Sequence, residues 1–148
     1  MPRSTKSSVF PDINVWVALT HSGHVHHQVA ADWFTDLNPD SRLYFCRFTQ
    51  LGFLRLLSSG AVMGDNAMNQ PDAWAAYDAW LRDKRIDYLD EPLGLEAHFR
   101  SLTGTRQTAP KDWADSYLAA FAAAAKLELA TFDRAFRARD MKLILLSA

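Results

Sequence analysis

The stretch Ser8-Val9-Phe10-Pro11-Asp12 decides the fold class, because it is a short apolar run that ends in an acid and leads into a helical pattern at 13–20. A buried strand that leads into a helix is the repeating unit of α/β proteins. The run Leu127-Glu128-Leu129-Ala130-Thr131-Phe132, near the other end of the chain, stops in the same way at Asp133. The sequence therefore predicts an α/β fold in which two acids each close a strand.

Strand-like and helix-like segments alternate between these two runs. Further strands are expected at 43–48, 86–89 and 142–146, and further helices at 26–37, 50–57, 69–83, 95–102, 113–125 and 134–139. The stretch 103–111 has the composition of a loop. We therefore expect one domain, residues 1–148, with a central, mostly parallel sheet of four to five strands flanked by helices.

Composition supports a single compact domain. The chain has 148 residues, 49% of them hydrophobic and 22% charged, which is enough to bury a full core. A net charge of -1 gives no global attraction to nucleic acid, so an RNA substrate would need a local basic patch and a bridging metal.

Three observations favour the cytoplasm. The lone cysteine, Cys46, cannot form an internal disulfide, and 1–6 lack the apolar core of a signal peptide. No apolar stretch approaches the roughly 18 residues that span a bilayer, so no membrane association is expected.

Acids at strand ends point to a metal site. The carboxyl ends of parallel strands meet at one edge of a sheet, so Asp12 and Asp133 are expected to converge there, joined by Asp115 at the head of a helix. Converging carboxylates repel each other, and a hard cation such as Mg²⁺, which takes one or two carboxylates and keeps several waters, relieves that cost. The three acids therefore predict a metal-dependent hydrolase.

Helix capping is the competing explanation for each acid. Aspartate is a favoured N-cap residue, and all three precede expected helices. The two roles can coexist, because a helix N-terminus helps to keep a carboxylate ionised. Asp112 competes with Asp115 for the site, since the two share a face of the first helical turn; we interpret Asp112 as the cap.

Four short sequence motifs resemble those of a known family. They are Pro11-Asp12-Ile13-Asn14-Val15-Trp16, Thr49-Gln50-Leu51-Gly52-Phe53-Leu54-Arg55, Trp113-Ala114-Asp115-Ser116-Tyr117-Leu118-Ala119-Ala120 and Leu129-Ala130-Thr131-Phe132-Asp133-Arg134. Together they resemble PIN-domain proteins, specifically VapC-type toxins of bacterial toxin–antitoxin pairs, over most of the chain. The resemblance implies a homodimeric, Mg²⁺-dependent endoribonuclease, in which Mn²⁺ can substitute, neutralised by a cognate VapB-type antitoxin.

Two amides complete the expected catalytic set beside the metal-binding Asp12, Asp115 and Asp133. Gln50 stands where such proteins often carry a glutamate; it can hydrogen-bond a metal-bound water but brings no charge, so metal affinity should fall. Asn14 lies two residues after Asp12 and could reach a metal-bound water or a phosphate oxygen.

Arginines near the acids are candidate substrate contacts. Arg134, directly after Asp133, is expected to contact a substrate phosphate, and Arg55 could pair with a carboxylate near the site. A solvated helix face explains both residues as well.

The expected reaction is in-line attack by metal-activated water, which leaves 5′-phosphate and 3′-hydroxyl ends. The resemblance implies a structured RNA target, such as a tRNA or rRNA loop. One alternative is a PIN-like module that binds RNA or protein without cutting, its metal site weakened by Gln50. Another is a non-toxin RNA-processing nuclease.

Two other chemistries have weaker support. A zinc site at His21, His24, His26 and His27 lacks partners at a recognisable spacing. Stacking of RNA bases on Trp33, Trp74 or Trp80 competes with core or dimer packing, since all three fall on apolar helical stripes.

Overall fold

The computed structural model describes residues 5–147. Its elements, in chain order, are β1 (Ser8–Pro11), α1 (Ile13–Thr20), α2 (His27–Asp36), β2 (Arg42–Phe45), α3 (Arg47–Leu57), α4 (Gly60–Met63), the 3-10 helix η1 (Gly64–Asn66), α5 (Gln70–Leu81), β3 (Ile86–Tyr88), α6 (Leu95–Leu102), α7 (Asp112–Ala125), β4 (Glu128–Thr131), the 3-10 helix η2 (Arg134–Ala138) and β5 (Leu143–Leu145). The α/β prediction is confirmed.

The five strands form one parallel sheet in the order β3-β2-β1-β4-β5. β1 lies at the centre, and β4 pairs with it so that Pro11 faces Ala130. The backbone N–H of Asp12 extends this ladder by donating to the Ala130 carbonyl at 2.8 Å. Asp12 and Asp133 therefore leave neighbouring strands at the same edge of the sheet.

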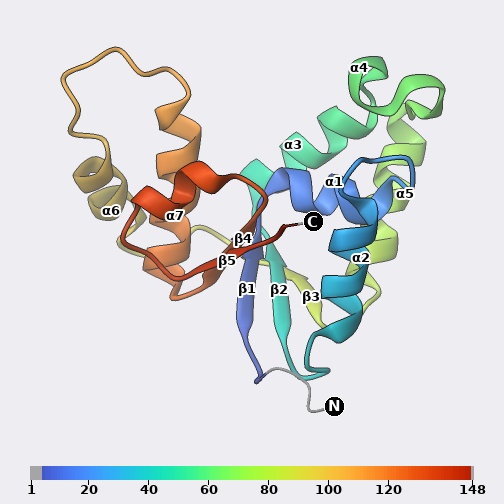
Figure 1. Ribbon diagram of the computed structural model, residues 1–148, viewed down its shortest axis with the longest axis horizontal. Coiled ribbons are helices and arrows are strands. Elements are labelled where there is room, and N and C mark those ends of the chain that lie inside the picture. The colour runs from blue at the N-terminus through green and yellow to red at the C-terminus, as the bar shows by residue number, and fades with distance from the viewer. Residues whose placement is uncertain (1–4, 148) are drawn as a thin grey trace.

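Helices cover the two faces of the sheet (Figure 1). α1, α2, α3 and α5 gather on one side, and α6 and α7 lie on the other. Successive residues of a strand point to opposite faces, so in β1 Val9 enters the core under the first group and Phe10 enters the core under α7. In the first core Trp16 stacks on Phe45, with ring centroids 4.0 Å apart, and in the second Phe10 stacks on Phe121, with ring centroids 4.6 Å apart.

The start of α3 differs from expectation. Cys46 and Phe48 were expected in a strand, but β2 ends at Phe45 and α3 begins at Arg47. The cause is a side-chain cap, since the Thr49 hydroxyl accepts a bond from the Cys46 N–H at 2.9 Å and so stops the strand. Burial raises the pKa of the Cys46 thiol, which keeps it an unreactive group. The short helices α4 and η1 lie between the helices expected at 50–57 and 69–83, where no element was expected.

α3 packs tightly against the start of α1. A methyl group added at Gly52 would overlap the Ile13 side chain, so the close approach of the two helices requires glycine at this position. Because Ile13 follows Asp12 directly, this contact holds α3 next to the predicted acidic site.

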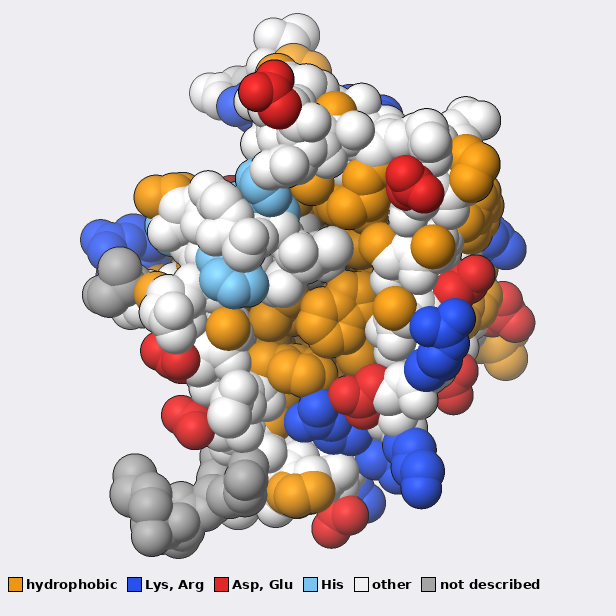
Figure 2. All heavy atoms as spheres, turned by 90° about the vertical axis from the view of Figure 1, so that its right-hand side faces the viewer, with side chains coloured by type: hydrophobic (Ala, Val, Ile, Leu, Met, Phe, Trp, Pro, Cys, Tyr) orange, Lys and Arg blue, Asp and Glu red, His pale blue; other side chains and the backbone are white. Residues whose placement is uncertain are grey.

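The face that carries α2 and α5 has an apolar hollow across its middle (Figure 2). Phe34 and Trp80 meet edge to face at 5.5 Å, and the Arg85 guanidinium covers Phe34 at 4.2 Å. Trp33 and Trp80 pack against the core, whereas Trp74 is 46% exposed. Within residues 5–147, no helix combines the length and the apolar character needed to cross a membrane.

Candidate active site

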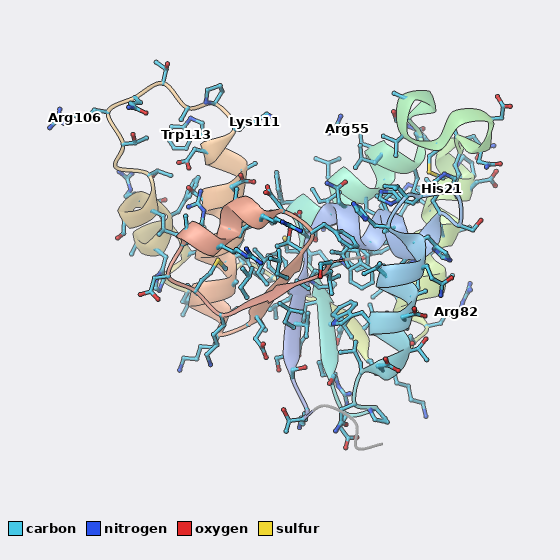
Figure 3. All side chains as sticks on the ribbon, viewed as in Figure 1. His21, Arg55, Arg82, Arg106, Lys111 and Trp113 are labelled. Atoms are coloured by element: carbon cyan, nitrogen blue, oxygen red, sulfur yellow. The ribbon has the colours of Figure 1, made fainter. Side chains whose placement is uncertain are left out.

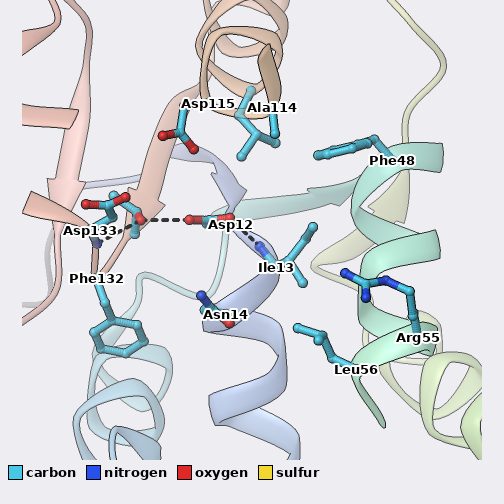
Figure 4. Close-up of a pocket in the computed structure, with 12 residues that line it drawn as sticks. Asp12, Ile13, Asn14, Phe48, Arg55, Leu56, Ala114, Asp115, Phe132 and Asp133 are labelled. Atoms are coloured by element: carbon cyan, nitrogen blue, oxygen red, sulfur yellow. Dashed lines mark hydrogen bonds between the residues drawn. The ribbon is translucent and has the colours of Figure 1, made fainter. Parts of the chain in front are cut away.

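A pocket of about 240 Å³ opens at the carboxyl edge of the sheet (Figure 4). Its walls come from the β1–α1 junction, α3, α7 and the end of β4, and its lining residues are Asp12, Ile13, Asn14, Phe48, Arg55, Leu56, Ala114, Asp115, Leu118, Thr131, Phe132 and Asp133. The structure thus brings the three sequence-predicted acids to one pocket, although they are far apart along the chain.

Asp12 is both a helix cap and a pocket residue. One carboxylate oxygen, Oδ1, accepts from the Ile13 N–H at 2.7 Å at the start of α1, and the other, Oδ2, accepts from the Thr131 hydroxyl at 2.9 Å. These bonds fix the orientation of the carboxylate. The two interpretations of this acid from the sequence are therefore compatible.

Thr131 joins two of the acids and was not anticipated. Its fully buried hydroxyl donates to Asp12 and accepts from the Asp133 N–H at 3.0 Å. Asp133 in turn caps η2, where its Oδ1 accepts from the Ala135 N–H at 2.9 Å. Thr131 and Asp133 are two residues apart at a strand end, and this spacing, which places side chains on one side of a strand, was the signal available in the sequence.

Asp115 lies in the first turn of α7, and a second set of contacts fixes that turn. Asp112 was expected to cap this helix, but it does not. Its Oδ1 instead forms an ion pair with the Arg139 guanidinium, with 2.8 Å between the oxygen and the nitrogen. The buried Ser116 hydroxyl donates to Asp112 Oδ2 at 3.1 Å and accepts from Arg139 at 3.1 Å. This Asp112–Ser116–Arg139 clamp joins α7, which carries Asp115, to the C-terminal end of η2. Asp133 caps the N-terminal end of the same helix.

The carboxylates pay an electrostatic cost for their position. Burial is the largest cause that raises the pKa of Asp12; the bonds from Thr131 and Ile13 oppose it, and the charges of Asp115 and Asp133 add to it. Burial and the charge of Asp133 also raise the pKa of Asp115, while Arg139 partly offsets that rise. The pocket therefore concentrates negative charge that a cation would neutralise.

The donor set fits a hydrated divalent cation. Within residues 5–147, no three His, Cys, Asp or Glu side chains lie close enough to hold one ion together. Mg²⁺ does not need such a cage, because it binds one or two carboxylates directly and reaches others through its waters. Carboxylate and amide oxygens are the donors that suit Mg²⁺ or Mn²⁺.

The other predicted residues divide into two groups. Asn14 lines the pocket, whereas Gln50 and Arg134 do not. Gln50 is 7% exposed, accepts a hydrogen bond from Arg47 and lies beside Tyr77 of α5, and Arg134 is exposed to solvent. Arg55 lines the pocket, yet in the described part of the chain it forms no ion pair with a carboxylate.

The histidine-rich loop between α1 and α2 lies beside this site. The His26 ring stacks on Phe132, a residue of the pocket wall, at 4.4 Å. His24 Nδ1 accepts from the His26 N–H at 3.0 Å, and the His27 ring bonds the Ala18 carbonyl at 2.7 Å. The loop therefore supports the pocket wall through stacking.

Sequence comparison identifies relatives of the whole domain. The model of the family described as PIN domain matches residues 9–142. The chain is 45% identical over 129 residues to Ribonuclease VapC41 of Mycobacterium tuberculosis, a match that covers 84% of this chain and 88% of that protein. It is 31% identical over 126 residues to Ribonuclease VapC29 of the same organism, with 85% and 86% covered.

Solved structures share the fold at low sequence identity. The crystal structure of VapBC2 from Rickettsia felis bound to a promoter DNA fragment matches with a TM-score of 0.68 and 12% identity, over 95% of this chain and 99% of that one. Mycobacterium tuberculosis VapC20, described as a Sarcin-Ricin loop cleaving toxin, matches with a TM-score of 0.64 and 18% identity, over 90% and 95%.

Proposed function

The chain belongs to the PIN-domain family and is a ribonuclease of the VapC type, and from that premise we propose an Mg²⁺-dependent endoribonuclease toxin that cleaves structured cellular RNA. The observation that carries this proposal is the pocket in which Asp12, Asp115 and Asp133 converge at the sheet edge. Burial and mutual repulsion raise the pKa of Asp12 and Asp115, which is the electrostatic state that binding of a cation relieves.

The proposed metal ligands are Asp12, Asp115 and Asp133, partly through water. When bound, Mg²⁺ acidifies water and offsets the charge that builds on the scissile phosphate. Thr131 and the Ile13 N–H hold the Asp12 carboxylate in a fixed orientation. Asn14, exposed in the same pocket, donates its amide to a phosphate oxygen.

Water is the proposed nucleophile. Of the described residues that line the pocket, none is a serine, cysteine or histidine, and the Thr131 hydroxyl is buried and bonded to Asp12. Attack by water on the phosphodiester leaves a 5′-phosphate and a 3′-hydroxyl end. Mn²⁺ is expected to replace Mg²⁺, because both prefer oxygen donors.

The proposed partners are a cognate VapB-type antitoxin, which neutralises the enzyme, and a second copy of the chain. The fold similarity to the VapBC2 structure supports the first. The apolar hollow on the face that carries α2 and α5, together with the exposed Trp74, supports a homodimer. RNA and antitoxin would both be met in the cytoplasm. A loop of tRNA or rRNA is the proposed target, since the VapC20 toxin of similar fold is described as cleaving the Sarcin-Ricin loop.

Cleavage of total bacterial RNA by partner-free protein tests this proposal. We expect discrete cuts with 5′-phosphate ends in Mg²⁺ or Mn²⁺, none in EDTA, and none with Asp12→Asn. Added VapB-type antitoxin should suppress the cuts. Metal-independent cutting, or full activity of Asp12→Asn, would contradict the metal-site mechanism.

The alternatives predict different results. The non-catalytic module was motivated by Gln50, but Gln50 does not line the pocket whereas the three acids do, so the geometry favours the nuclease. An RNA-processing nuclease shares the chemistry but would not arrest growth. Expression with and without the antitoxin separates the two, since only a toxin arrests growth in an antitoxin-dependent way.

A further inference from the structure

Arg55 reaches into the active-site pocket from the wall opposite Asp115 and Asp133 (Figure 4). Among the described lining residues it is the only one with a positive charge, beside three carboxylates. In residues 5–147, its guanidinium has neither an ion-pair nor a hydrogen-bond partner. Its N–H donors are therefore available to a ligand.

Several other arginines make contacts within the protein. Arg85, Arg100 and Arg139 pair with Asp83, Glu96 and Asp112, respectively. Arg47, on the same helix as Arg55, donates to Gln50 and lies over the Tyr88 ring at 5.0 Å. Within α3, therefore, Arg47 is held by contacts inside the protein, whereas Arg55 lines the pocket.

The packing of α3 determines that position. Gly52 lies against Ile13, and Arg55 follows Gly52 by almost one helical turn, so its side chain starts close to the Asp12 end of α1. Leu51, four residues before Arg55 on the same helix face, is 62% exposed. A cation beside exposed apolar surface suits a nucleotide, which presents a phosphate next to a sugar and a base.

We propose that Arg55 binds the RNA phosphate next to the scissile one, and that this contact rather than Arg134 supplies the phosphate recognition of the site; the inference rests on the proposed ribonuclease function. An acidic pocket repels a polyanion, and the net charge of -1 provides no compensating field. A metal ion held by the three acids would neutralise charge on their side of the pocket. The planar fork of Arg55 binds two oxygens of the adjacent phosphate.

RNA binding, measured apart from cleavage, tests this role. Asp12→Asn protein is titrated into a fluorescent single-stranded RNA at several salt concentrations, alone and combined with Arg55→Met, Arg55→Lys, Arg134→Met or Arg82→Met. Arg82 is the matched control, because it is also exposed but lies far from Arg55 (Figure 3). We expect Arg55→Met to raise Kd about tenfold for all RNA sequences and to reduce the log–log salt slope by about 0.7. Arg55→Lys should lose part of the affinity, since it keeps the charge but not the fork.

A second measurement uses the catalytically intact protein. Arg55→Met should raise KM about tenfold and leave kcat and the Mg²⁺ dependence unchanged, because it removes binding energy common to substrate and transition state. Exposure of Arg55 predicts an unchanged thermal midpoint.

Each outcome decides the proposal. An unchanged Kd and salt slope in Arg55→Met would overturn it, and loss of binding in Arg134→Met instead would assign the phosphate contact to that residue. An effect on antitoxin binding alone would overturn it as well. RNA binding that depends on Arg55, in a protein that never cuts, would refute the nuclease and keep the Arg55 contact.

Discussion

The two walls of the active-site pocket are built in different ways. The wall made by β4, η2 and α7 carries Asp115 and Asp133 and is braced by the Thr131 hydroxyl and by the Asp112–Ser116–Arg139 clamp. The α3 wall presents Arg55 without any partner in the described residues. The difference indicates that the acidic wall is fixed before a ligand arrives, whereas the α3 wall acquires its polar partner from the substrate.

The fixed acidic wall keeps carboxylates that repel one another close together. Burial, together with the neighbouring carboxylates, raises the pKa of Asp12 and of Asp115, so the folded, metal-free protein ionises these groups at a cost. A bound cation would stabilise the ionised carboxylates and so offset that cost. The comparison of the two walls therefore predicts that substitutions in the acidic wall act on metal binding and catalysis, and that those in the α3 wall act on RNA affinity.

The largest effect is expected for Asp12→Asn, which removes a proposed metal ligand between the two walls. Asparagine keeps the size of the side chain and can still accept from the Ile13 N–H, so the fold should persist. We expect the cleavage rate to fall by about 10³-fold, the loss of several kcal/mol of transition-state stabilisation. The measurement is the initial rate of RNA cleavage, with Asp78→Asn, an exposed carboxylate on α5, as the control. A loss below about tenfold would exclude Asp12 as a ligand.

The next largest effect tests the bracing of the acidic wall. Asp112→Asn removes the negative charge of the clamp and one of its two acceptor oxygens, and the Arg139 and Asp112 side chains of this pair are only 20% and 32% exposed. We expect about a tenfold lower cleavage rate and a higher Mg²⁺ concentration for half-maximal rate, because α7 and η2 would no longer hold Asp115 and Asp133 in register. The free energy of unfolding, measured in urea, should fall by about 1–2 kcal/mol.

Glu96→Gln is the matched control for the clamp. It breaks the Arg100–Glu96 pair of α6, whose side chains are 79% and 75% exposed. Exposed pairs contribute little, so neither the rate nor the unfolding free energy should change measurably. Unaltered Mg²⁺ dependence in Asp112→Asn, together with reduced stability, would show that the clamp is structural and does not position the acids.

A smaller effect concerns the stability of the metal-free protein. The folded state raises the pKa of Asp12 above the ordinary value of 3.8, so it binds the proton more tightly than the unfolded chain does. Ionisation of Asp12 therefore lowers the free energy of unfolding as the pH rises toward neutrality. The Asp12→Asn protein does not show this loss, because an amide does not ionise. In EDTA at pH 7, we therefore expect the Asn variant to melt at a higher temperature than the wild type.

Two further arms define this stability test. The part of the difference between wild type and Asp12→Asn that comes from ionisation should disappear as the pH falls below 3.8, where the wild-type carboxyl is protonated in both states. Added Mg²⁺ should raise the melting temperature of the wild type more than that of the variant, since a ligand that binds only the folded state stabilises it. A metal-free variant that melts below the wild type would show that the Thr131 bond outweighs the burial cost.

The sequence predicted the acidic wall better than the α3 wall, for a physical reason. Asp12 and Asp133 follow apolar runs that end as strands, and parallel strands bring their carboxyl ends together. The role of Arg55 depends instead on the rotational phase of α3, and that phase requires the correct first residue. The expected helix began at Gln50, with Phe48 in a strand, because the Thr49 cap was not recognised.

Because α3 begins at Arg47, the direction in which each of its side chains points can be worked out. Arg55 lies seven residues after Phe48 and so shares its face, whereas Gln50, two residues after Phe48, points about 200° away. Both Phe48 and Arg55 line the pocket, as this geometry requires. Tight packing of Gly52 on Ile13, which no local pattern shows, places that face over the site.

The smallest effect is expected for Gln50→Glu, which restores the glutamate that the family resemblance led us to expect. Gln50 lies on the far side of α3, where it contacts Arg47 and Tyr77, so a carboxylate there would not reach the metal. We expect the cleavage rate and the half-saturating Mg²⁺ concentration to stay within about twofold of wild type, as for the exposed control Gln107→Glu. A tenfold gain in Mg²⁺ affinity would place residue 50 in the metal site and would make the α3 wall part of the catalytic wall, because helix α3 would then have to rotate to bring that carboxylate into the pocket.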